Sequence, residues 1–580
     1  MGAPEMSLYP DASLQKLKIS NNVQFLQQMR FLNRTTRGIR QEIFHVNDSA
    51  WPDMWHAQPD KFPSLGVYNA WLLGYGGMGV HITILDDGVE PDHPDLAANY
   101  DAANSYDYLY EQQYVNHTLG DFHGTWCAGI VAATKNSDCV LGMAYEAKFS
   151  AVKIFDEFYG LTDFGESLAL SHNLARTDVY SNSWGPVDDG ETFEGPGPLA
   201  QEALERAVTE GRDGKGAIFT WAAGNGGIYD DCGCDGYAGS RYTISVTAVG
   251  RDQGASWYSE ECSSVFIGAY SGDSPDLRIS TTDTGGACTN RFQGTSASCP
   301  MAAGIIALAL EANPELTWRD VQHLIAATAS TSGLVRAGWQ KNGAGLRVSH
   351  VFGFGLINAE AIVNAAVMWN NVSPQTQCTS DVILVDRLSA NGVEVVSEHV
   401  SRGCDLVQYL EHVEVWISFY ATYRGSVQFI LTSPAGTDSR LLRPRRFDVS
   451  NGTTDWTFMT VMSWGERPMG VWTLRMETTD SSTEFGLNSW RLSLYGVQTA
   501  PSYVDAQVLP QSDADETTAG AIAGGVVGGL AVVAFVVVAL VYILVGKKAK
   551  SPAIHPEASG VVNPSMNARY PEGTTVNGDA

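Results

Sequence analysis

Hydrophobic and polar positions divide the chain into parts of different pattern. Up to Trp369, apolar runs typical of buried strands alternate with helical patterns rich in small residues. Val80–Gly88 (VHITILDDG) is such a strand, and Ile305–Ala312 (IIALALEA) belongs to a buried helix. After Trp369, short β-runs separated by turn residues indicate an antiparallel sandwich. We therefore predict an α/β domain with a parallel sheet, followed by an all-β domain.

A long apolar run follows near the C-terminus. Ala519–Gly546 holds 28 residues without a charge, and about 20 are enough to cross a membrane as a helix. Acidic residues precede this run and lysines follow it, so the positive-inside rule places the C-terminus in the cytosol. We expect one transmembrane helix, with everything before Ala519 in a lumen or outside the cell.

The N-terminus lacks the pattern of a signal peptide. MGAPEMSLYPDASLQ has no basic start followed by an apolar stretch. A protein with this membrane orientation needs such a signal, so we expect that the first part of the precursor is missing from this sequence.

Charge and cysteine content narrow the function classes. The 64 acidic residues outnumber the 36 basic ones, and a net charge of -28 repels nucleic acids but attracts cations and basic peptides. The nine cysteines form no CxxC pair, which excludes a zinc ribbon or a thioredoxin-like motif. A lumenal location permits disulfides and makes the sequons possible glycan acceptors, at Asn33, Asn47, Asn116, Asn371 and Asn451.

Three separate segments each place a side chain that could take part in catalysis close to a glycine. Asp86 ends the strand VHITILDDG, His123 lies at a turn in HGTWCA, and Ser296 lies in GTSAS at the start of the buried helix. Each motif alone is weak, because such residues are often turns, structural histidines or helix caps. Together they follow the chain order of the subtilisin type of serine triad. Asn225, in WAAGNGG, could donate its amide to a developing oxyanion.

Further motifs make the chain resemble the kexin/furin-type proprotein convertases of the subtilisin-like serine protease superfamily. The matching segments are ILDDG, HGTWCAG, SNSWGPVDDG, WAAGNGG, CGCDGY, WYSEECSS and GTSAS, in the family's order and spacing. The resemblance implies that Asp86 orients and charge-stabilises His123 and that His123 is the general base and then the general acid. It also implies that Ser296 forms an acyl-enzyme and that Asn225 completes the oxyanion hole.

The resemblance also implies pockets for basic side chains, which need carboxylates in a site of low dielectric. The family's pair for the Arg before the scissile bond corresponds to Asp188 and Asp235; its pocket for a basic residue four positions before the bond corresponds to Glu166, Glu194 and Tyr237. Asp87 corresponds to part of the pocket for the penultimate residue. Gly120 stands where relatives usually carry an acid, with Asp121 beside it, so the choice between Lys/Arg-Arg and Arg-x-x-Arg motifs stays open.

Calcium is the cofactor that the resemblance implies, since Ca²⁺ takes oxygen ligands from carboxylates and amides. The ligand sets that correspond to the family's are Asp48, Asp95 and Asn136 for one site and Asp188, Asp230 and Glu260 for another. Only Asp107 remains of a peripheral acidic cluster, so we expect that third site to be missing. By resemblance, the disulfides are Cys139–Cys288, Cys232–Cys262 and Cys378–Cys404, which leaves Cys127, Cys234 and Cys299 free.

The resemblance implies an α/β fold: a subtilisin-like three-layer catalytic domain, an all-β P domain matched by LEH, LTSPAGT, DWTFMTVMSWGE and WTLRM, and one transmembrane helix. The expected order is a partial propeptide (1–40), catalytic domain (41–370), P domain (371–498), stalk (499–518), transmembrane helix (519–546) and cytoplasmic tail (547–580).

The expected function is that of a calcium-dependent serine endopeptidase that processes proproteins after Arg in the secretory pathway. We place it in the Golgi or trans-Golgi network, with the endosome or cell surface as alternatives. Its partners are basic proprotein substrates, its own propeptide as inhibitor, and the membrane, but not nucleic acid. Rival hypotheses are a degradative subtilisin-like protease of broad specificity and a catalytically silent cell-surface receptor or adhesion protein.

We predict autocleavage after Arg40, because Arg37-Gly38-Ile39-Arg40 places an Arg one and four positions before the bond to Gln41. The competing bond follows Arg37, where Arg34 has the same spacing. N-terminal sequencing of the active protein should find Gln41 first. An active protein that begins well before Gln41 would contradict the prediction.

Overall fold

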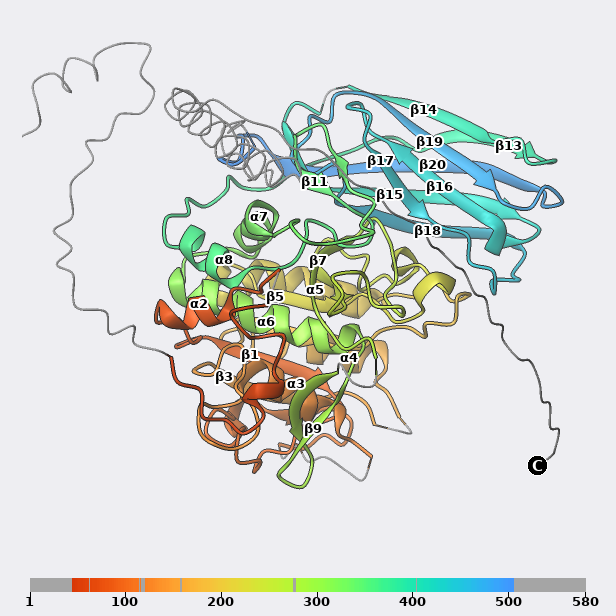
Figure 1. Cartoon of the computed structure of the whole chain (residues 1–580). Helices are drawn as coiled ribbons and strands as arrows, with labels where there is room; N and C mark the ends of the chain where they lie inside the picture. The colour runs from red at the N-terminus through yellow and green to blue at the C-terminus, as the bar shows by residue number, and fades with distance from the viewer. Residues whose placement is uncertain are drawn as a thin grey trace, which may run out of the picture. The chain divides into compact units, whose positions relative to one another are not determined.

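The computed structural model describes residues 44–504, apart from residues 62, 114, 116–119, 157, 158, 275–277 and 403. An α/β part and a β-sandwich, both seen in Figure 1, belong to one compact unit. The predicted propeptide, both cleavage sites, the transmembrane helix and the tail lie outside the described residues, and so do Asn33 and Asn116.

A parallel sheet forms the centre of the α/β part. Its seven strands follow the order β2-β3-β1-β4-β5-β6-β7, and every neighbouring pair is parallel. The strands are β1 (His81–Asp86), β2 (Tyr106–Asp107), β3 (Lys148–Lys153), β4 (Val179–Asn182), β5 (Ile218–Ala222), β6 (Thr243–Val249) and β7 (Val265–Tyr270). All residues of β1, β4, β5, β6 and β7 are buried, as expected where helices cover both faces of a sheet.

Helices lie on both faces of this sheet and complete the three predicted layers. One face packs against α2 (Val67–Leu72), α3 (His123–Ala132), α6 (Thr295–Ala312), α7 (Trp318–Thr328) and α8 (Ala359–Ala366). The other packs against α4 (Asp163–Leu170) and α5 (Pro198–Glu210). The remaining strands of this part are β8 (Ile279–Asp283), β9 (Ala287–Phe292), β10 (Gln340–Lys341) and β11 (Arg347–Val348).

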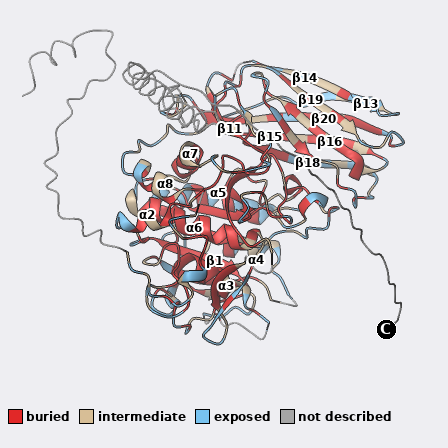
Figure 2. Ribbon diagram, in the orientation of Figure 1, coloured by how far each residue is buried: buried red, intermediate tan, exposed pale blue. Residues whose placement is uncertain are grey.

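The helix α6 crosses the interior of the α/β part, as Figure 2 shows. Among the described residues it alone is long and apolar enough to span a membrane, but 83% of that stretch is buried within the fold. Its length and composition are therefore those of a core helix. The segment predicted to span the membrane, residues 519–546, is not among the described residues.

The predicted β-sandwich is confirmed. One sheet has the order β12-β20-β15-β18, with β13 also paired to β20, and the other has the order β14-β19-β16-β17. The strands are β12 (Thr376–Thr379), β13 (Ile383–Ser389), β14 (Val395–Ser401), β15 (Tyr409–Ala421), β16 (Val427–Thr432), β17 (Asp438–Leu442), β18 (Gly452–Thr460), β19 (Gly470–Thr478) and β20 (Phe485–Val497). Buried and half-buried residues alternate along β16, which is the pattern of a strand with one face in a core.

Three disulfides link the cysteines as predicted: Cys139–Cys288, Cys232–Cys262 and Cys378–Cys404. The remaining cysteines, Cys127, Cys234 and Cys299, are free and buried. The sequon residues Asn47, Asn371 and Asn451 are exposed, so each could accept a glycan.

The α/β part and the sandwich share a hydrophobic core. Met459, Val461, Met462 and Trp464 of the sandwich pack into the core of the α/β part, while Cys234 packs into that of the sandwich. Because the cores interpenetrate, the two parts fold against each other, and the boundary expected near residue 370 stays a prediction.

A buried ion-pair network joins the same two parts through Glu411. Its carboxylate accepts hydrogen bonds from the guanidinium of Arg319, from Nε2 of His323 at 2.7 Å and from Nε2 of Gln375 at 2.7 Å. Burial alone would raise the pKa of Glu411, but Arg319 and His323 outweigh it and hold that pKa below its usual value. Glu411 therefore stabilises the contact between β15 and α7 as an anion.

We predict that Glu411→Gln lowers the free energy of unfolding by about 3–5 kcal/mol at neutral pH, because it leaves Arg319 buried without its counter-charge. The folded-state pKa of Glu411 is depressed, so its contribution is present above the unfolded pKa near ~4.3 and is lost as the pH falls further. The difference in unfolding free energy between the variant and the wild type, measured by thermal unfolding, should therefore stay nearly constant from pH 7 to pH 5 and shrink as the pH falls below about 4, toward the depressed folded-state pKa.

Glu398→Gln is the matched control, because Glu398 is exposed on β14. Equal unfolding temperatures for Glu411→Gln and the wild type at pH 7 would show that the network adds no stability.

Candidate active site

The predicted acid and base of the triad meet at the carboxyl end of β1. Asp86 ends that strand and His123 begins α3. Nδ1 of His123 lies 2.9 Å from Oδ1 and 3.0 Å from Oδ2 of Asp86. Asp86 is 1% exposed, whereas the side chain of His123 is 27% exposed. The carboxylate thus fixes one ring nitrogen and leaves Nε2 for chemistry.

The charge on Asp86 favours a protonated His123. Burial disfavours a positive charge on the His123 ring and would lower its pKa. The attraction of the Asp86 carboxylate outweighs this effect, so the pKa of His123 lies well above its usual value. The ring is also held by Phe292, which it meets edge to face at 5.4 Å between centroids.

Asp87 holds the start of α3. Its carboxylate accepts hydrogen bonds from the backbone N–H groups of Phe122 at 3.1 Å, His123 at 3.0 Å and Gly124 at 2.7 Å. A Cβ on Gly124 would lie 2.1 Å from the carbonyl oxygen of Gly88, so only glycine fits this approach. Burial and the charge of Asp86 raise the pKa of Asp87 to about 7.

Ser296 lies in the first turn of α6 and is half-buried. Its Oγ donates to the backbone oxygen of Ser183 at 3.4 Å, and its own backbone oxygen accepts from Oγ of Ser183 at 3.1 Å. Gly294, just before the helix, has φ +95°, a conformation that favours glycine. This turn orients the hydroxyl at the end of a rigid buried helix.

Asn225 is anchored to Thr295, the residue before the predicted nucleophile Ser296. Its Oδ1 accepts from the backbone N–H of Thr295 at 2.8 Å and from Oγ1 of Thr295 at 3.1 Å. Its backbone N–H donates to Oδ2 of Asp188 at 2.7 Å. Since Oδ1 is occupied, the exposed side chain presents its NH₂ group as a donor, as the oxyanion role requires.

The carboxylates expected for the penultimate basic residue have intramolecular partners. Asp121 is buried and accepts from Nζ of the fully buried Lys153 at 2.5 Å. Asp87 caps α3, as described above. A substrate side chain would therefore have to share both acids with groups of the protein itself. Neither partnership could be expected from the sequence, because Lys153 lies 32 residues from Asp121 and Gly124 lies 37 residues from Asp87.

The acids predicted for the Arg before the scissile bond lie near the carboxyl end of β5. Oδ1 of Asp235 accepts from the backbone N–H groups of Tyr237 at 2.6 Å and Ala238 at 3.2 Å. A Cβ on Gly185 would lie 3.0 Å from Oδ2, so that oxygen faces the glycine. Burial, with the charges of Asp188 and Asp230, raises the pKa of Asp235 to about 7. A positive charge that binds beside Asp235 would favour its ionised form, which burial and the neighbouring acids disfavour.

The acids predicted for the residue four positions earlier also gather. The hydroxyl of Tyr237 donates to Oε2 of Glu166 on α4 at 2.5 Å. Glu194 is exposed, and its backbone pairs with the segment of Asp235. Burial raises the pKa of Glu166, and the charge of Glu194 adds to the effect. Glu166, Glu194 and Tyr237 thus lie in one cluster, whose negative charge comes from the two carboxyl groups.

The first predicted calcium-ligand set is brought together. Asp48 is 2% exposed and Asp95 is fully buried. Asn136 donates from its backbone to Oδ1 of Asp48 at 3.2 Å and from Nδ2 to Oδ1 of Asp95 at 2.9 Å. Oδ2 of Asp48 is buried and has no hydrogen-bond partner among the described residues. An orphaned carboxylate oxygen beside a second acid fits a bound Ca²⁺.

The second predicted set adjoins Asp235, because the charges of Asp188 and Asp230 both raise the pKa of that residue. Oε1 of Glu260 accepts from the backbone N–H of Gly226 at 2.8 Å, and Oδ1 of Asp230 accepts from Arg445 at 3.1 Å. Burial and the charges of Asp188 and Asp230 raise the pKa of Glu260 well above its usual value. Asp188, Asp230 and Glu260 lie close together, and among the described residues Arg445 is the one basic side chain that pairs with any of them. A bound cation would fit this set, because its charge would let the three carboxyl groups ionise together.

Two free thiols lie close to the triad. Sγ of Cys127 is 3.7 Å from Oδ2 of Asp86 and 3.8 Å from the backbone oxygen of Ser296. Cys299 donates to the backbone oxygen of Asn182 at 3.3 Å. Burial raises the pKa of Cys127 to about 12 and also raises that of Cys299, so both remain neutral thiols.

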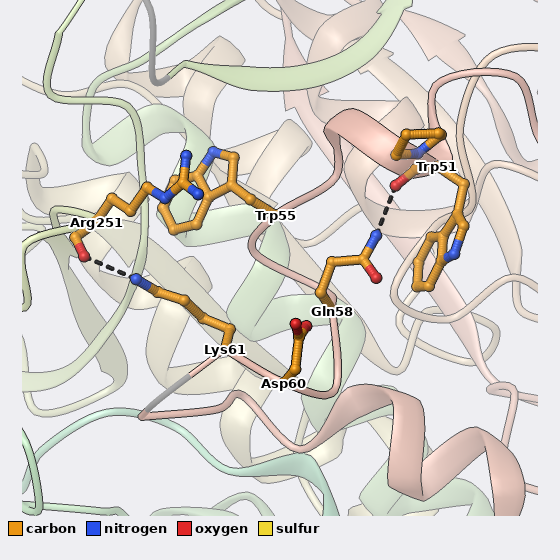
Figure 3. Close-up of a pocket in the computed structure, with 7 residues that line it drawn as sticks. Trp51, Trp55, Gln58, Asp60, Lys61 and Arg251 are labelled. Atoms are coloured by element: carbon orange, nitrogen blue, oxygen red, sulfur yellow. Dashed lines mark hydrogen bonds between the residues drawn. The ribbon is translucent and has the colours of Figure 1, made fainter.

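A separate pocket of about 550 Å³ contains none of the predicted site residues. Figure 3 shows two of its lining residues, Trp51 and Trp55, and the hydrogen bond from Nζ of Lys61 to the backbone oxygen of Arg251, which is 2.7 Å long. It is lined by Trp51, Pro52, Trp55, Gln58, Asp60, Lys61 and Arg251. The candidate site is thus defined by the convergence of side chains at the strand ends, not by this pocket.

Comparison with known proteins agrees with this arrangement. Residues 77–355 match the subtilase family, and residues 410–494 match the proprotein convertase P-domain. Proprotein convertase subtilisin/kexin type 6 of Rattus norvegicus is 44% identical over 513 residues, which cover 84% of this chain and 54% of the relative. Type 5 of the same species is 43% identical over 511 residues, covering 84% and 28%.

Furin-like protease 1 of Drosophila melanogaster is 41% identical over 486 residues, which cover 82% of this chain and 38% of that protein. The chain thus spans about half or less of the length of these relatives. The crystal structure of Aeromonas sobria serine protease with its chaperone superposes with a TM-score of 0.70 at 22% identity, over 78% of this chain and 96% of that one. This likeness shows a shared fold.

We predict that Asn225→Ala lowers kcat about 10²–10³-fold with little change in KM, because the side chain donates to charge that develops only in the transition state; the magnitude is the one measured in subtilisin. Steady-state kinetics on an Arg-containing fluorogenic peptide would test this. Asn488→Ala, on β20 of the sandwich, is the matched control. A change confined to KM would contradict the oxyanion role.

Proposed function

This chain belongs to the subtilase family, in its proprotein convertase group, and we propose that it is a calcium-dependent serine endopeptidase that cleaves proproteins after Arg at basic motifs. The observation that supports the proposal is the placement of the predicted catalytic residues at one edge of the sheet: Asp86, His123, Asn225 and Ser296. Nearby lie the carboxyl groups of Asp188, Asp230 and Asp235, whose negative charges are not balanced by an equal number of basic side chains among the described residues.

The reaction begins when Oγ of Ser296 attacks the carbonyl carbon of the scissile bond and Nε2 of His123 takes its proton. Nδ2 of Asn225 donates to the oxyanion. His123 then gives the proton to the leaving amine, and the substrate remains as an ester on Ser296. A water, deprotonated by His123, hydrolyses this ester. Only neutral His123 can accept the proton, so its raised pKa shifts activity toward higher pH.

Specificity for Arg would follow from the predicted substrate-binding carboxylates that form no ion pair with a basic side chain among the described residues. Asp235 and Asp188 would pair with the guanidinium before the scissile bond, and Glu166 and Glu194 with a basic side chain four positions earlier. Asp87 and Asp121 are already bonded within the protein, which favours Arg-x-x-Arg over Lys/Arg-Arg motifs.

A bound calcium ion would supply the positive charge that lets neighbouring carboxylates ionise together. Asp48, Asp95 and Asn136 would hold one ion, and Asp188, Asp230 and Glu260 another. The second set adjoins the Arg pocket, since the charges of Asp188 and Asp230 both act on Asp235.

Maturation and location complete the proposal. We infer autocleavage after Arg40, with the released propeptide as an inhibitor, and anchorage in a secretory membrane through residues 519–546. The supporting features are the Arg spacing before Gln41, the uncharged apolar run, and three disulfides, which require an oxidising compartment.

The test uses the full chain, produced in a secretory host behind a supplied secretion signal and convertase propeptide. Fluorogenic peptides Arg-x-Lys-Arg, Arg-x-x-Arg and Ala-Ala-Pro-Phe would be compared with calcium and with chelator. We expect rapid cleavage after Arg only, lost on chelation, because the acids can then neither bind Arg productively nor remain ionised together.

Asp235→Asn should abolish the preference for Arg, whereas Asp455→Asn, a change at an exposed residue of β18, should not. Preference for the Phe peptide would instead identify a degradative protease. Failure of a serine-directed label on matured protein would indicate a catalytically silent one.

A further inference from the structure

The loop between β4 and α5 carries two of the predicted substrate-binding acids, Asp188 and Glu194. Between those two acids, residues 190–193 lie against the sandwich, so the conformation of the loop depends on groups from the other part of the molecule.

Arg445 of the sandwich contacts this loop from beneath and is 1% exposed. Its Nη1 donates to the backbone oxygen of Thr192 at 3.0 Å and to Oδ1 of Asp230 at 3.1 Å. Its Nη2 donates to the backbone oxygen of Glu191 at 3.2 Å and to Oδ2 of Asp448 at 2.9 Å. One guanidinium therefore holds two loop carbonyls and one predicted calcium ligand.

Arg424 makes the parallel contact. Its Nη2 donates to the backbone oxygen of Glu191 at 2.7 Å, and its Nε donates to Oδ2 of Asp448 at 2.6 Å. The guanidiniums of Arg424 and Arg445 lie 4.5 Å and 4.4 Å from the ring centroid of Phe193. Phe193, which directly precedes Glu194, is thus clamped by two cation–π contacts.

The clamped segment is connected to the pockets on both sides. Upstream, the backbone N–H of Gly190 donates to Oδ2 of Asp230 at 2.8 Å. Downstream, the backbone N–H of Glu194 donates to the oxygen of Cys234 at 3.2 Å, and its oxygen accepts from Gly236 at 2.8 Å. The segment that carries Asp235 therefore pairs with the loop directly after Phe193.

We propose that Arg424 and Arg445 are positioning residues of the sandwich that set the spacing of the substrate-binding acids Asp188, Glu194 and Asp235. The proposal rests on the proposed function and deepens it, because it makes selectivity for a basic side chain four positions before the scissile bond a property of both parts of the chain. Neither arginine touches substrate; each acts through the loop.

The required group is a guanidinium and not merely a positive charge. Arg445 uses its planar donors on four acceptors that point in different directions, which a Lys ammonium on a flexible stem cannot satisfy together. A Lys substitution keeps the charge beside Asp230 and Asp448, so it loosens the loop without leaving those acids uncompensated.

The experiment compares Arg445→Lys and Arg424→Lys in the full chain with the wild type. Arg467→Lys is the matched control, since Arg467 is a sandwich arginine that lies 4.2 Å over the ring of Tyr409 and contacts neither the loop nor its acids. The primary readout is the ratio of kcat/KM for Arg-x-x-Arg and Ala-x-x-Arg peptides. The rate at which a small fluorophosphonate labels Ser296 and the thermal unfolding temperature are measured in parallel.

We expect the ratio to fall about tenfold in Arg445→Lys, through a higher KM for the Arg-x-x-Arg peptide, the scale of one hydrogen bond to a charged group. Arg424→Lys should show a smaller fall, and labelling of Ser296 should be unchanged in both. If Arg445→Lys fails to fold, the fall in Arg424→Lys alone decides the question.

Unchanged kcat/KM ratios in the variants that fold would overturn the inference. Equal losses of Ser296 labelling and of peptide cleavage would also overturn it, because a merely structural role of the arginines would produce that result. A wild type that shows no preference for Arg peptides would instead overturn the proposed function, and this inference with it.

Discussion

An acid buried without a counter-charge is costly, and this constraint governs how the molecule is built. The chain has 28 more acidic than basic residues and places many carboxylates inside. Some are neutralised within the fold, as Asp121 is by Lys153 and Glu411 by Arg319. These pairs tie strands, helices and the sandwich into one unit. Other acids, such as Asp87 and Glu260, are left without such an ion pair among the described residues, and burial raises their pKa values.

The leftover acids explain why stability and function are linked. A carboxyl whose pKa rises on folding costs stability once the pH exceeds its unfolded pKa, and Asp235 and Glu260 are of this kind. A bound cation, either Ca²⁺ or the guanidinium of a substrate, removes that cost. In the proposed function, calcium binding and recognition of Arg would therefore draw on the same source of free energy.

Much of the site could be predicted because its chemistry is local in sequence. Asp86 and His123 are carried by short motifs at a strand end and a helix start, where residue type and turn geometry appear together. The layers, the sandwich and the disulfides followed from pattern and resemblance. The partners of Asp87, Asp121 and Asp230 could not be predicted, because their hydrogen bonds join segments far apart in the chain. Arg445, for example, lies 215 residues from Asp230.

The sandwich is accordingly more than a support placed beside an enzyme. Trp464 completes the core of the α/β part, and Glu411 holds α7 by charge. The same sandwich presents Arg445 to the loop that carries Asp188 and Glu194, the acids proposed to bind substrate. A stabilising contact and the proposed positioning contact thus come from the same sandwich, so a change that shifts the sandwich should move the loop of Asp188 and Glu194 as well. Because the fit of an Arg side chain to paired carboxylates is directional, such small displacements alter recognition before they unfold the chain.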